Sequence, residues 1–135
     1  MSDNSRIRAI TILDNLSTQR YASLFDLPKN LEYTFVKGDI LDSNDLSRAM
    51  SDVDAVVHLA AITNAEGSFD ISEQVQSVNL GGTKNVLQSC IQHGVKSLVF
   101  PSTTSVYGPV SGIARAARDR SDLKPKSPYA TSNLA

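Results

Sequence analysis

The chain has 135 residues, of which 41% are hydrophobic and 20% are charged. This composition is typical of one soluble globular domain, and it disfavours a disordered chain, a collagen-like repeat and a disulfide scaffold. The formal net charge is -1 at pH 7 and no block of basic residues is present, so we expect no nucleic acid partner.

The cysteine content and the N-terminal residues favour a cytoplasmic protein. The lone Cys90 cannot form an internal disulfide or, by itself, a zinc site, which favours a reducing compartment and no bound metal. Residues 1–8 are polar and lack the apolar core of a signal peptide. No apolar run approaches the ~18 residues that cross a bilayer, so we expect no membrane partner.

Short apolar runs predict β-strands over residues 8–13, 33–37, 55–61 and 97–101. The third run is almost unbroken in its apolar character, and the fourth has the same character. Such runs are typical of strands that are covered on both faces of a parallel sheet.

Helical spacing fills the segments between these runs. Asp42 or Ser43 can cap a first helix, which ends near Asp52. A longer helix is expected over residues 72–93, and Gly94 supplies its stop. The apolar residues that recur along it at three- and four-residue steps are Val75, Val78, Val86, Leu87, Cys90 and Ile91. We assign Cys90 to the core.

Strands that alternate with helices of this length predict an α/β fold with a parallel sheet and right-handed crossovers. Residues 108–127 show no apolar period, so we expect a surface loop there. This loop is either a mobile cover over a pocket or a disordered segment. A further helix is predicted to begin at Ser127 and Pro128.

In open parallel sheets, ligands bind outside the carboxyl ends of the strands. Asp14, after the first run, can accept hydrogen bonds from the hydroxyls of an adenosine ribose and would repel a 2'-phosphate, which favours NAD over NADP. Asp39 can accept a hydrogen bond from the exocyclic amine of adenine. The alternative is that Asp14, Asn15 and Asp39 only form turns.

Tyr129 and Asn133 lie four residues apart on one face of the last predicted helix. A tyrosine hydroxyl can act as an acid or base on a substrate hydroxyl, but its ordinary pKa of ~10 must be lowered by an adjacent cation. Asn133 carries no charge to do so.

Several segments, taken together and in this order, carry a family resemblance. They are Asp14-Asn15-Leu16-Ser17-Thr18, Gly38-Asp39-Ile40, Val57-His58-Leu59-Ala60-Ala61, Val78-Asn79-Leu80-Gly81-Gly82-Thr83, Ser102-Thr103-Thr104-Ser105-Val106-Tyr107-Gly108 and Ser127-Pro128-Tyr129-Ala130-Thr131-Ser132. The chain resembles the extended short-chain dehydrogenase/reductases, and among them the NAD-dependent epimerase/dehydratase family, to which UDP-glucose 4-epimerase belongs. The resemblance covers residues 8–135.

The resemblance implies a Rossmann-like sheet that binds NAD. Its expected cofactor contacts are Asp14 and Asn15 for the adenosine ribose, Asp39 and Ile40 for the adenine, Leu59, Ala60 and Ala61 along the pyrophosphate and ribose, and Asn79 on the cofactor side of the central helix. Gly81 and Gly82 would each cost roughly 1 kcal/mol in a helix relative to alanine, and close packing against the sheet would explain them. His58 is interpreted as a packed, hydrogen-bonded histidine rather than a base.

The resemblance also implies a reaction. Tyr129 would take a proton from a sugar hydroxyl while hydride passes to the nicotinamide, and Thr103 would orient that hydroxyl. An epimerase would return the hydride to the other face of the sugar, whereas a dehydratase would first eliminate water.

The sequence departs from the family pattern in two places. The first strand and the Gly-x-x-Gly-x-x-Gly turn have no match, and in the family that strand lies between those matched by residues 8–13 and 55–61. Two strand edges should therefore be unpaired and apolar faces exposed, an arrangement that is prone to aggregation. The family's Tyr-x-x-x-Lys reads Tyr129 to Asn133, and a neutral amide can replace the lysine only in part, as a ligand of the nicotinamide ribose.

We therefore expect residues 1–135 to be a partial NAD(P)-binding Rossmann domain, from the family's second strand through the helix of the catalytic tyrosine. The leading hypothesis is a fragment of an NAD-dependent epimerase/dehydratase that acts on a nucleotide sugar, with little or no activity of its own. The alternative is a non-catalytic, degenerate dehydrogenase domain that serves as an interaction module, its open sheet completed by another chain or in a homodimer. A third hypothesis is a reductase of another small carbonyl compound.

Overall fold

The computed structural model describes residues 7–63, 67–108 and 123–134. Its elements, in chain order, are β1 (Ala9–Asp14), the 3-10 turn η1 (Tyr21–Leu24), β2 (Glu32–Lys37), α1 (Ser43–Ala49), β3 (Ala55–Val57), the 3-10 turn η2 (Gly67–Phe69), α2 (Ser72–Val75), the π-helical segment η3 (Gln76–Gly82), α3 (Thr83–Gln92), β4 (Ser97–Val99), the 3-10 turn η4 (Thr104–Tyr107) and α4 (Pro128–Ser132). Within these ranges, no helix combines the length and the apolar character that crossing a membrane requires.

The strands form two parallel pairs. β1 pairs with β2, from Ala9 opposite Glu32 to Asp14 opposite Lys37. β3 pairs with β4, from Ala55 opposite Ser97 to Val57 opposite Val99. The α/β class and the parallel direction are therefore confirmed.

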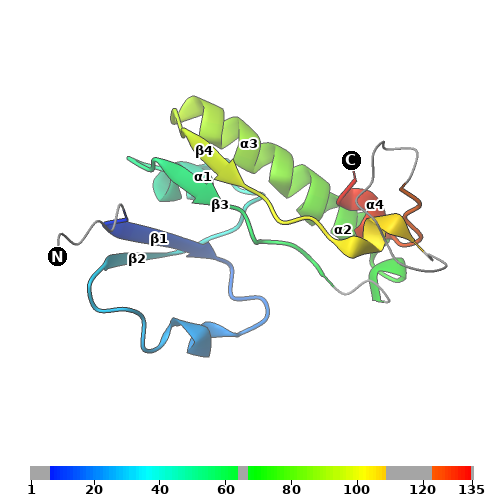
Figure 1. The fold of residues 1–135 in the computed structure, drawn as a ribbon, viewed down its shortest axis with the longest axis horizontal. Helices are drawn as coiled ribbons and strands as arrows, with labels where there is room; N and C mark the ends of the chain where they lie inside the picture. Colours follow the sequence, from blue (N-terminus) through cyan, green and yellow to red (C-terminus); the bar gives the residue numbers. More distant parts are fainter. Residues whose placement is uncertain (1–6, 64–66, 109–122, 135) are drawn as a thin grey trace.

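In the described part of the chain, the two pairs are separate two-stranded sheets, and β1 is not hydrogen-bonded to β3. Figure 1 shows the β1–β2 pair set apart from the β3–β4 pair. This break lies between β1 and β3, where the resemblance implies a further strand.

The first helix follows the local rules that predicted it. The Asp42 side chain caps α1 by accepting a hydrogen bond from the main-chain N–H of Asn44, with a donor-acceptor distance of 2.8 Å. Leu46, Ala49 and Met50 are buried, so the expected apolar face is the inner one. The helix ends at Ala49 with Met50 as its C-cap, and Asp52 adopts a positive φ of 57°.

The predicted helix over residues 72–93 is also present, as the consecutive elements α2, η3 and α3. Gly94 ends it with a positive φ of 66°, and the Val95 N–H returns to the Cys90 carbonyl at 2.9 Å. Val86 and Cys90 are buried.

The prediction of the apolar face is wrong for two residues, Leu87 and Ile91. Leu87 is 44% exposed and Ile91 is 76% exposed. Each follows one position after Val86 or Cys90, which turns it about 100° around the helix and away from the core.

The core lies between α1, α3 and the strands. Its buried members are Ile40, Leu46, Met50, Val86 and Cys90, and the partly buried side chains packed against them are Leu13, Val56, Val78, Val95 and Leu98. Helix α3 runs alongside β3 and β4 (Figure 1).

The expectation that β3 and β4 are covered on both faces is wrong for the described residues. Val56 and Leu98 face the core, but Val57 is 62% exposed and Val99 is 58% exposed. Alternate residues of a strand point to opposite faces, so helices cover one face only. The loop predicted over residues 108–127 lies largely outside the described residues.

Candidate functional site

The carboxyl ends of β1 and β2 bring together the polar residues that the sequence singled out. Asp14 ends β1 and Asn15 follows it, while Asp39 lies two residues beyond the end of β2. The Asn15 Nδ2 atom donates a hydrogen bond to the Asp39 Oδ2 atom at 3.0 Å. Parallel pairing places both strand ends at the same edge of the sheet, and this produces the juxtaposition.

These side chains also form turns, as the alternative interpretation of the sequence expects. Asp14 Oδ1 accepts from the Leu16 N–H at 2.6 Å, Asn15 Oδ1 accepts from the Ser17 N–H at 3.0 Å, and Asp39 Oδ1 accepts from the Leu41 N–H at 2.9 Å. A carboxylate has about four acceptor positions, so Asp14 and Asp39 retain capacity to accept bonds from a ligand.

Ile40 differs from its neighbours at this edge. Its side chain is buried in the core, and its carbonyl accepts a hydrogen bond from Asn85 Nδ2 at 3.2 Å. What Ile40 can offer a ligand is therefore its main chain.

The segment after β3 is exposed but held in place. Leu59 is 69% exposed, and Ala60 and Ala61 are exposed as well. The buried Asn79 side chain holds the main chain of Ile62, accepting from its N–H at 2.8 Å and donating to its carbonyl at 3.0 Å. Asn79 Nδ2 also donates to Ser132 Oγ at 3.2 Å, so one amide connects η3 to the end of α4.

His58 is packed, as predicted. It is buried, it stacks on Phe100 with ring centroids 5.5 Å apart, and its Nε2 atom lies 2.9 Å from Thr83 Oγ1. The single hydroxyl proton of Thr83 is donated to the Asn79 carbonyl, so Thr83 Oγ1 accepts from His58 Nε2–H. Burial lowers the pKa of His58 below its ordinary 6.5, which favours this neutral form.

Of the candidate catalytic residues, Thr103 directly precedes η4 and Tyr129 lies in α4, and these two elements contact each other. Thr103 caps η4, and its Oγ1 accepts from the Ser105 N–H at 3.2 Å. Tyr129 is half-buried, and its main-chain N–H donates to Ser68 Oγ at 3.4 Å. Asn133 Nδ2 donates to the Tyr129 carbonyl at 3.0 Å, so this amide is engaged with its own helix.

The start of α4 also follows its sequence prediction. Ser127 caps the helix by accepting from the Ala130 N–H at 3.1 Å, and Pro128 occupies the first turn.

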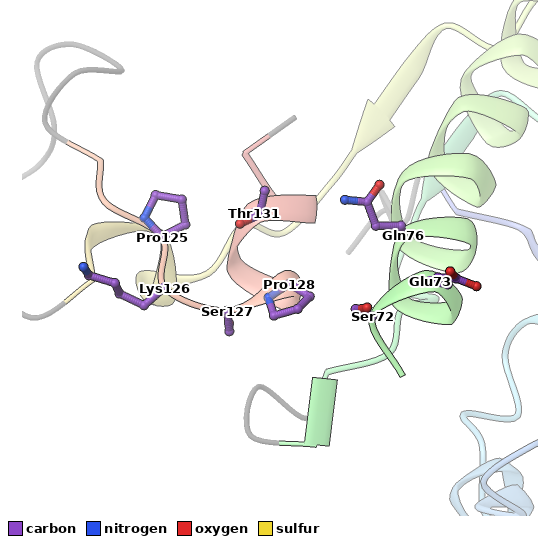
Figure 2. Close-up of a pocket in the computed structure, with 8 residues that line it drawn as sticks. All are labelled: Ser72, Glu73, Gln76, Pro125, Lys126, Ser127, Pro128 and Thr131. Atoms are coloured by element: carbon purple, nitrogen blue, oxygen red, sulfur yellow. The ribbon is translucent and has the colours of Figure 1, made fainter. Parts of the chain in front are cut away.

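A groove of about 640 Å³, which the sequence did not indicate, lies beside α4. Figure 2 shows the residues that line it, which are Ser72, Glu73, Gln76, Pro125, Lys126, Ser127, Pro128 and Thr131. None of the site residues predicted from the sequence is among them. Across the described ranges, no three His, Cys, Asp or Glu side chains gather as a metal site would require.

The model of the NAD dependent epimerase/dehydratase family matches residues 3–135. The chain belongs to this family. Among the curated relatives of this epimerase/dehydratase chain, the dTDP-glucose 4,6-dehydratase of Streptomyces antibioticus is 35% identical over 127 residues, which are 93% of the chain and 36% of the relative. A UDP-glucose epimerase of Bacillus subtilis, described as uncharacterized, is 31% identical over 113 residues, 83% of the chain and 34% of the relative.

Solved structures of the family share the fold. The UDP-glucose 4-epimerase of Thermus thermophilus, a complex with NAD, has a TM-score of 0.78 at 35% identity, covering 92% of the chain and 39% of the epimerase. The dTDP-glucose 4,6-dehydratase DesIV of Streptomyces venezuelae, with NAD and TYD bound, has a TM-score of 0.81 at 30% identity, covering 96% and 40%. The chain thus spans 36% of the length of the Streptomyces antibioticus relative, little more than a third, and has the Rossmann-type architecture of its solved neighbours.

Proposed function

We propose that residues 1–135 form part of an NAD-binding Rossmann domain, from its second strand through the helix of the catalytic tyrosine, in an NAD-dependent epimerase/dehydratase of nucleotide sugars. The observation that carries this proposal is the cluster of Asp14, Asn15 and Asp39 at the carboxyl edge of β1 and β2.

The hydrogen-bond acceptors at this edge of the sheet fit the adenosine end of NAD. The ribose hydroxyls and the adenine amine are hydrogen-bond donors, and the carboxylates of Asp14 and Asp39 are acceptors. The negative charge of Asp14 also opposes a 2'-phosphate, so the edge suits NAD better than NADP. When bound, NAD supplies a hydride acceptor and donor for a sugar carbon.

The chain offers fewer contacts to the pyrophosphate of NAD than to its adenosine. Leu59, Ala60 and Ala61 are exposed and available to lie along it. However, the sequence contains no Gly-x-x-Gly-x-x-Gly turn to supply main-chain N–H groups to phosphates. We therefore expect a polypeptide of these 135 residues to bind NAD weakly.

Thr103 and Tyr129 are the proposed catalytic residues. Tyr129 Oη would take the proton of a sugar hydroxyl, and Thr103 Oγ1 would orient that hydroxyl, since η4 and α4 pack together. Asn133 supplies no positive charge to stabilise a phenolate, and its amide already donates to the Tyr129 carbonyl. We therefore propose that this polypeptide alone has little or no activity. A cytoplasmic location is also proposed, supported by the single, buried Cys90.

Calorimetric titration with NAD and NADP tests the proposal. We expect NAD to bind no more tightly than millimolar, and NADP to bind more weakly than NAD. Micromolar binding of NAD would contradict the argument about the phosphates. A preference for NADP would contradict the role of Asp14.

A second candidate function rests on the separate strand pairs. Within the described residues, β1 pairs only with β2 and β3 pairs only with β4, and Val57 and Val99 are exposed on the uncovered face. An interaction module could complete its sheet with another chain or a second copy. Light scattering distinguishes the two functions: a well-folded, monodisperse dimer would support the interaction module, whereas an unfolded or aggregating product would favour the fragment.

A further inference from the structure

Asp45, in the first turn of α1, reaches back to the turn that follows β2. Its Oδ2 atom accepts a hydrogen bond from the main-chain N–H of Asp39 at 2.9 Å. Its Oδ1 atom accepts from Arg48 Nη2 at 2.5 Å. The hydrogen bond from Asp39, and then the Arg48 side chain, lower the pKa of the Asp45 carboxyl, so it is ionised at neutral pH.

This contact depends on the absence of a side chain at Gly38. A Cβ atom there would lie 2.6 Å from Asp45 Cγ and 2.7 Å from Asp45 Oδ2, which is closer than such atoms approach. The Gly38 N–H donates to the Asp14 carbonyl at 3.1 Å and so extends the β1–β2 pairing by one bond. The main chain is therefore fixed immediately before Asp39.

The main chain is fixed after Asp39 as well. The Ile40 carbonyl is held by Asn85, and its side chain is buried in the core. Between these two fixed points, Asp45 holds the N–H of Asp39 itself. The Asp39 carboxylate lies at the sheet edge, where its Oδ2 atom accepts a hydrogen bond from the Asn15 amide.

We propose that Asp45 is a positioning residue for adenine recognition, because it holds the main chain of Asp39 so that the Asp39 carboxylate faces the nucleotide edge. This inference rests on the proposed function, in which Asp39 accepts a hydrogen bond from the adenine amine. A residue with this role controls the choice of base. A residue that only caps a helix would change the affinity for all nucleotides equally.

The choice of base is measured by titrating the full chain with AMP and with IMP. IMP carries an oxygen where adenine has its amine, so a carboxylate that accepts from the amine repels it. One charge-assisted hydrogen bond corresponds to a preference of about tenfold for AMP over IMP in the wild-type chain.

Three substitutions separate the contacts of Asp45. Asp45→Ala removes the acceptor of the Asp39 N–H, and we expect the preference to fall to near onefold. Asp45→Asn keeps an acceptor oxygen and should restore most of the preference. Arg48→Ala removes the ion pair alone and should also keep most of it. Asp54→Ala is the matched control, since Asp54 is a carboxylate paired with Lys96 at 2.8 Å and belongs to neither β2 nor α1.

Gly38→Ala tests the same contact from the other side, by placing a Cβ against the Asp45 carboxylate. Gly38→Ala should lower the preference for AMP over IMP as Asp45→Ala does. It replaces Asp45→Ala as the test variant if Asp45→Ala does not fold. A folded Asp45→Ala or Gly38→Ala chain that keeps the wild-type preference overturns the inference alone. A wild-type chain that binds neither nucleotide, or both equally, overturns the adenine role of Asp39 in the proposed function, and the inference with it.

Discussion

Two adjacent glycines in η3 are expected to differ in their response to the same substitution. A Cβ added at Gly82 would collide with Ile40 Cδ1 and lie 2.8 Å from Ile40 Cγ1, and Ile40 is buried in the core. A Cβ added at Gly81 would have Leu41 Cδ2, at 3.9 Å, as its nearest neighbour. Close packing therefore explains Gly82 but not Gly81, and the partner is the turn after β2 rather than a strand.

The magnitude follows from two opposing terms. Alanine favours a helix over glycine by about 1 kcal/mol, and this gain applies to both positions. Overpacking a core costs roughly 1 to 3 kcal/mol, and this cost applies at Gly82 only. Gly81→Ala should therefore stabilise the chain by up to about 1 kcal/mol. Gly82→Ala should leave it roughly 1 to 3 kcal/mol less stable than Gly81→Ala, because the helix gain cancels in the comparison.

Urea denaturation, followed by far-ultraviolet circular dichroism, measures both free energies of unfolding. The control is the same pair of substitutions in an Ile40→Ala background, which lacks the two atoms that the new Cβ would meet. In that background, Gly81→Ala and Gly82→Ala should have similar free energies of unfolding. Equal stabilities of Gly81→Ala and Gly82→Ala in the wild-type background would refute the packing argument.

Two further stability predictions follow from buried polar groups. Asn79→Ala removes three hydrogen bonds, to Ile62 N–H, Ile62 carbonyl and Ser132, and should cost about 3 kcal/mol of unfolding free energy. The control is Gln88→Ala at an exposed position of α3, which should stay within about 0.5 kcal/mol of wild type. A similarly small loss for Asn79→Ala would show that its three hydrogen bonds contribute little to stability. Burial lowers the pKa of His58 in the folded chain, so the unfolded chain takes up a proton first as the pH falls below 6.5. The contribution of His58 to the free energy of unfolding should therefore be fully present above pH 6.5 and should fall below it, by at most about 1.4 kcal/mol per pH unit. The His58→Gln variant should show a smaller dependence of stability on pH. A urea midpoint that is unchanged or higher in acid would be evidence against this contribution.

Local chemistry made much of the fold predictable. The cap at Asp42, the stop at Gly94 and the Ser127 and Pro128 start of α4 each depend on a few neighbouring residues, and each was confirmed. The exposure of Val57 and Val99 was not predictable in this way. An apolar strand sequence indicates that the side chains on both faces of the strand are suited to burial. Whether both faces are covered depends on other segments of the chain that pack against the strand.

The candidate site was predictable for a different reason. The rule that parallel strands end at one edge placed Asp14 and Asn15 beside Asp39, and the structure confirms this proximity. Asp45 was missed, because its contact with the Asp39 N–H depends on how closely α1 approaches the turn. Gly38 was the available signal, since the close approach requires a glycine there.

The groove beside α4 was also missed. Its walls come from the start of the long helix and from residues 125–131, which no local sequence pattern connects (Figure 2).

The proposed function depends on recognition of the adenosine end of NAD by the edge that Asp14, Asn15 and Asp39 form. The most direct test is a residue-resolved ¹H–¹⁵N spectrum of the chain during titration with NAD and with AMP. We expect both ligands to shift the same amide signals, those of the turns after β1 and β2, and we expect Asp39→Ala to abolish these shifts. Shifts confined to other segments, or none at all with either ligand, would contradict this recognition.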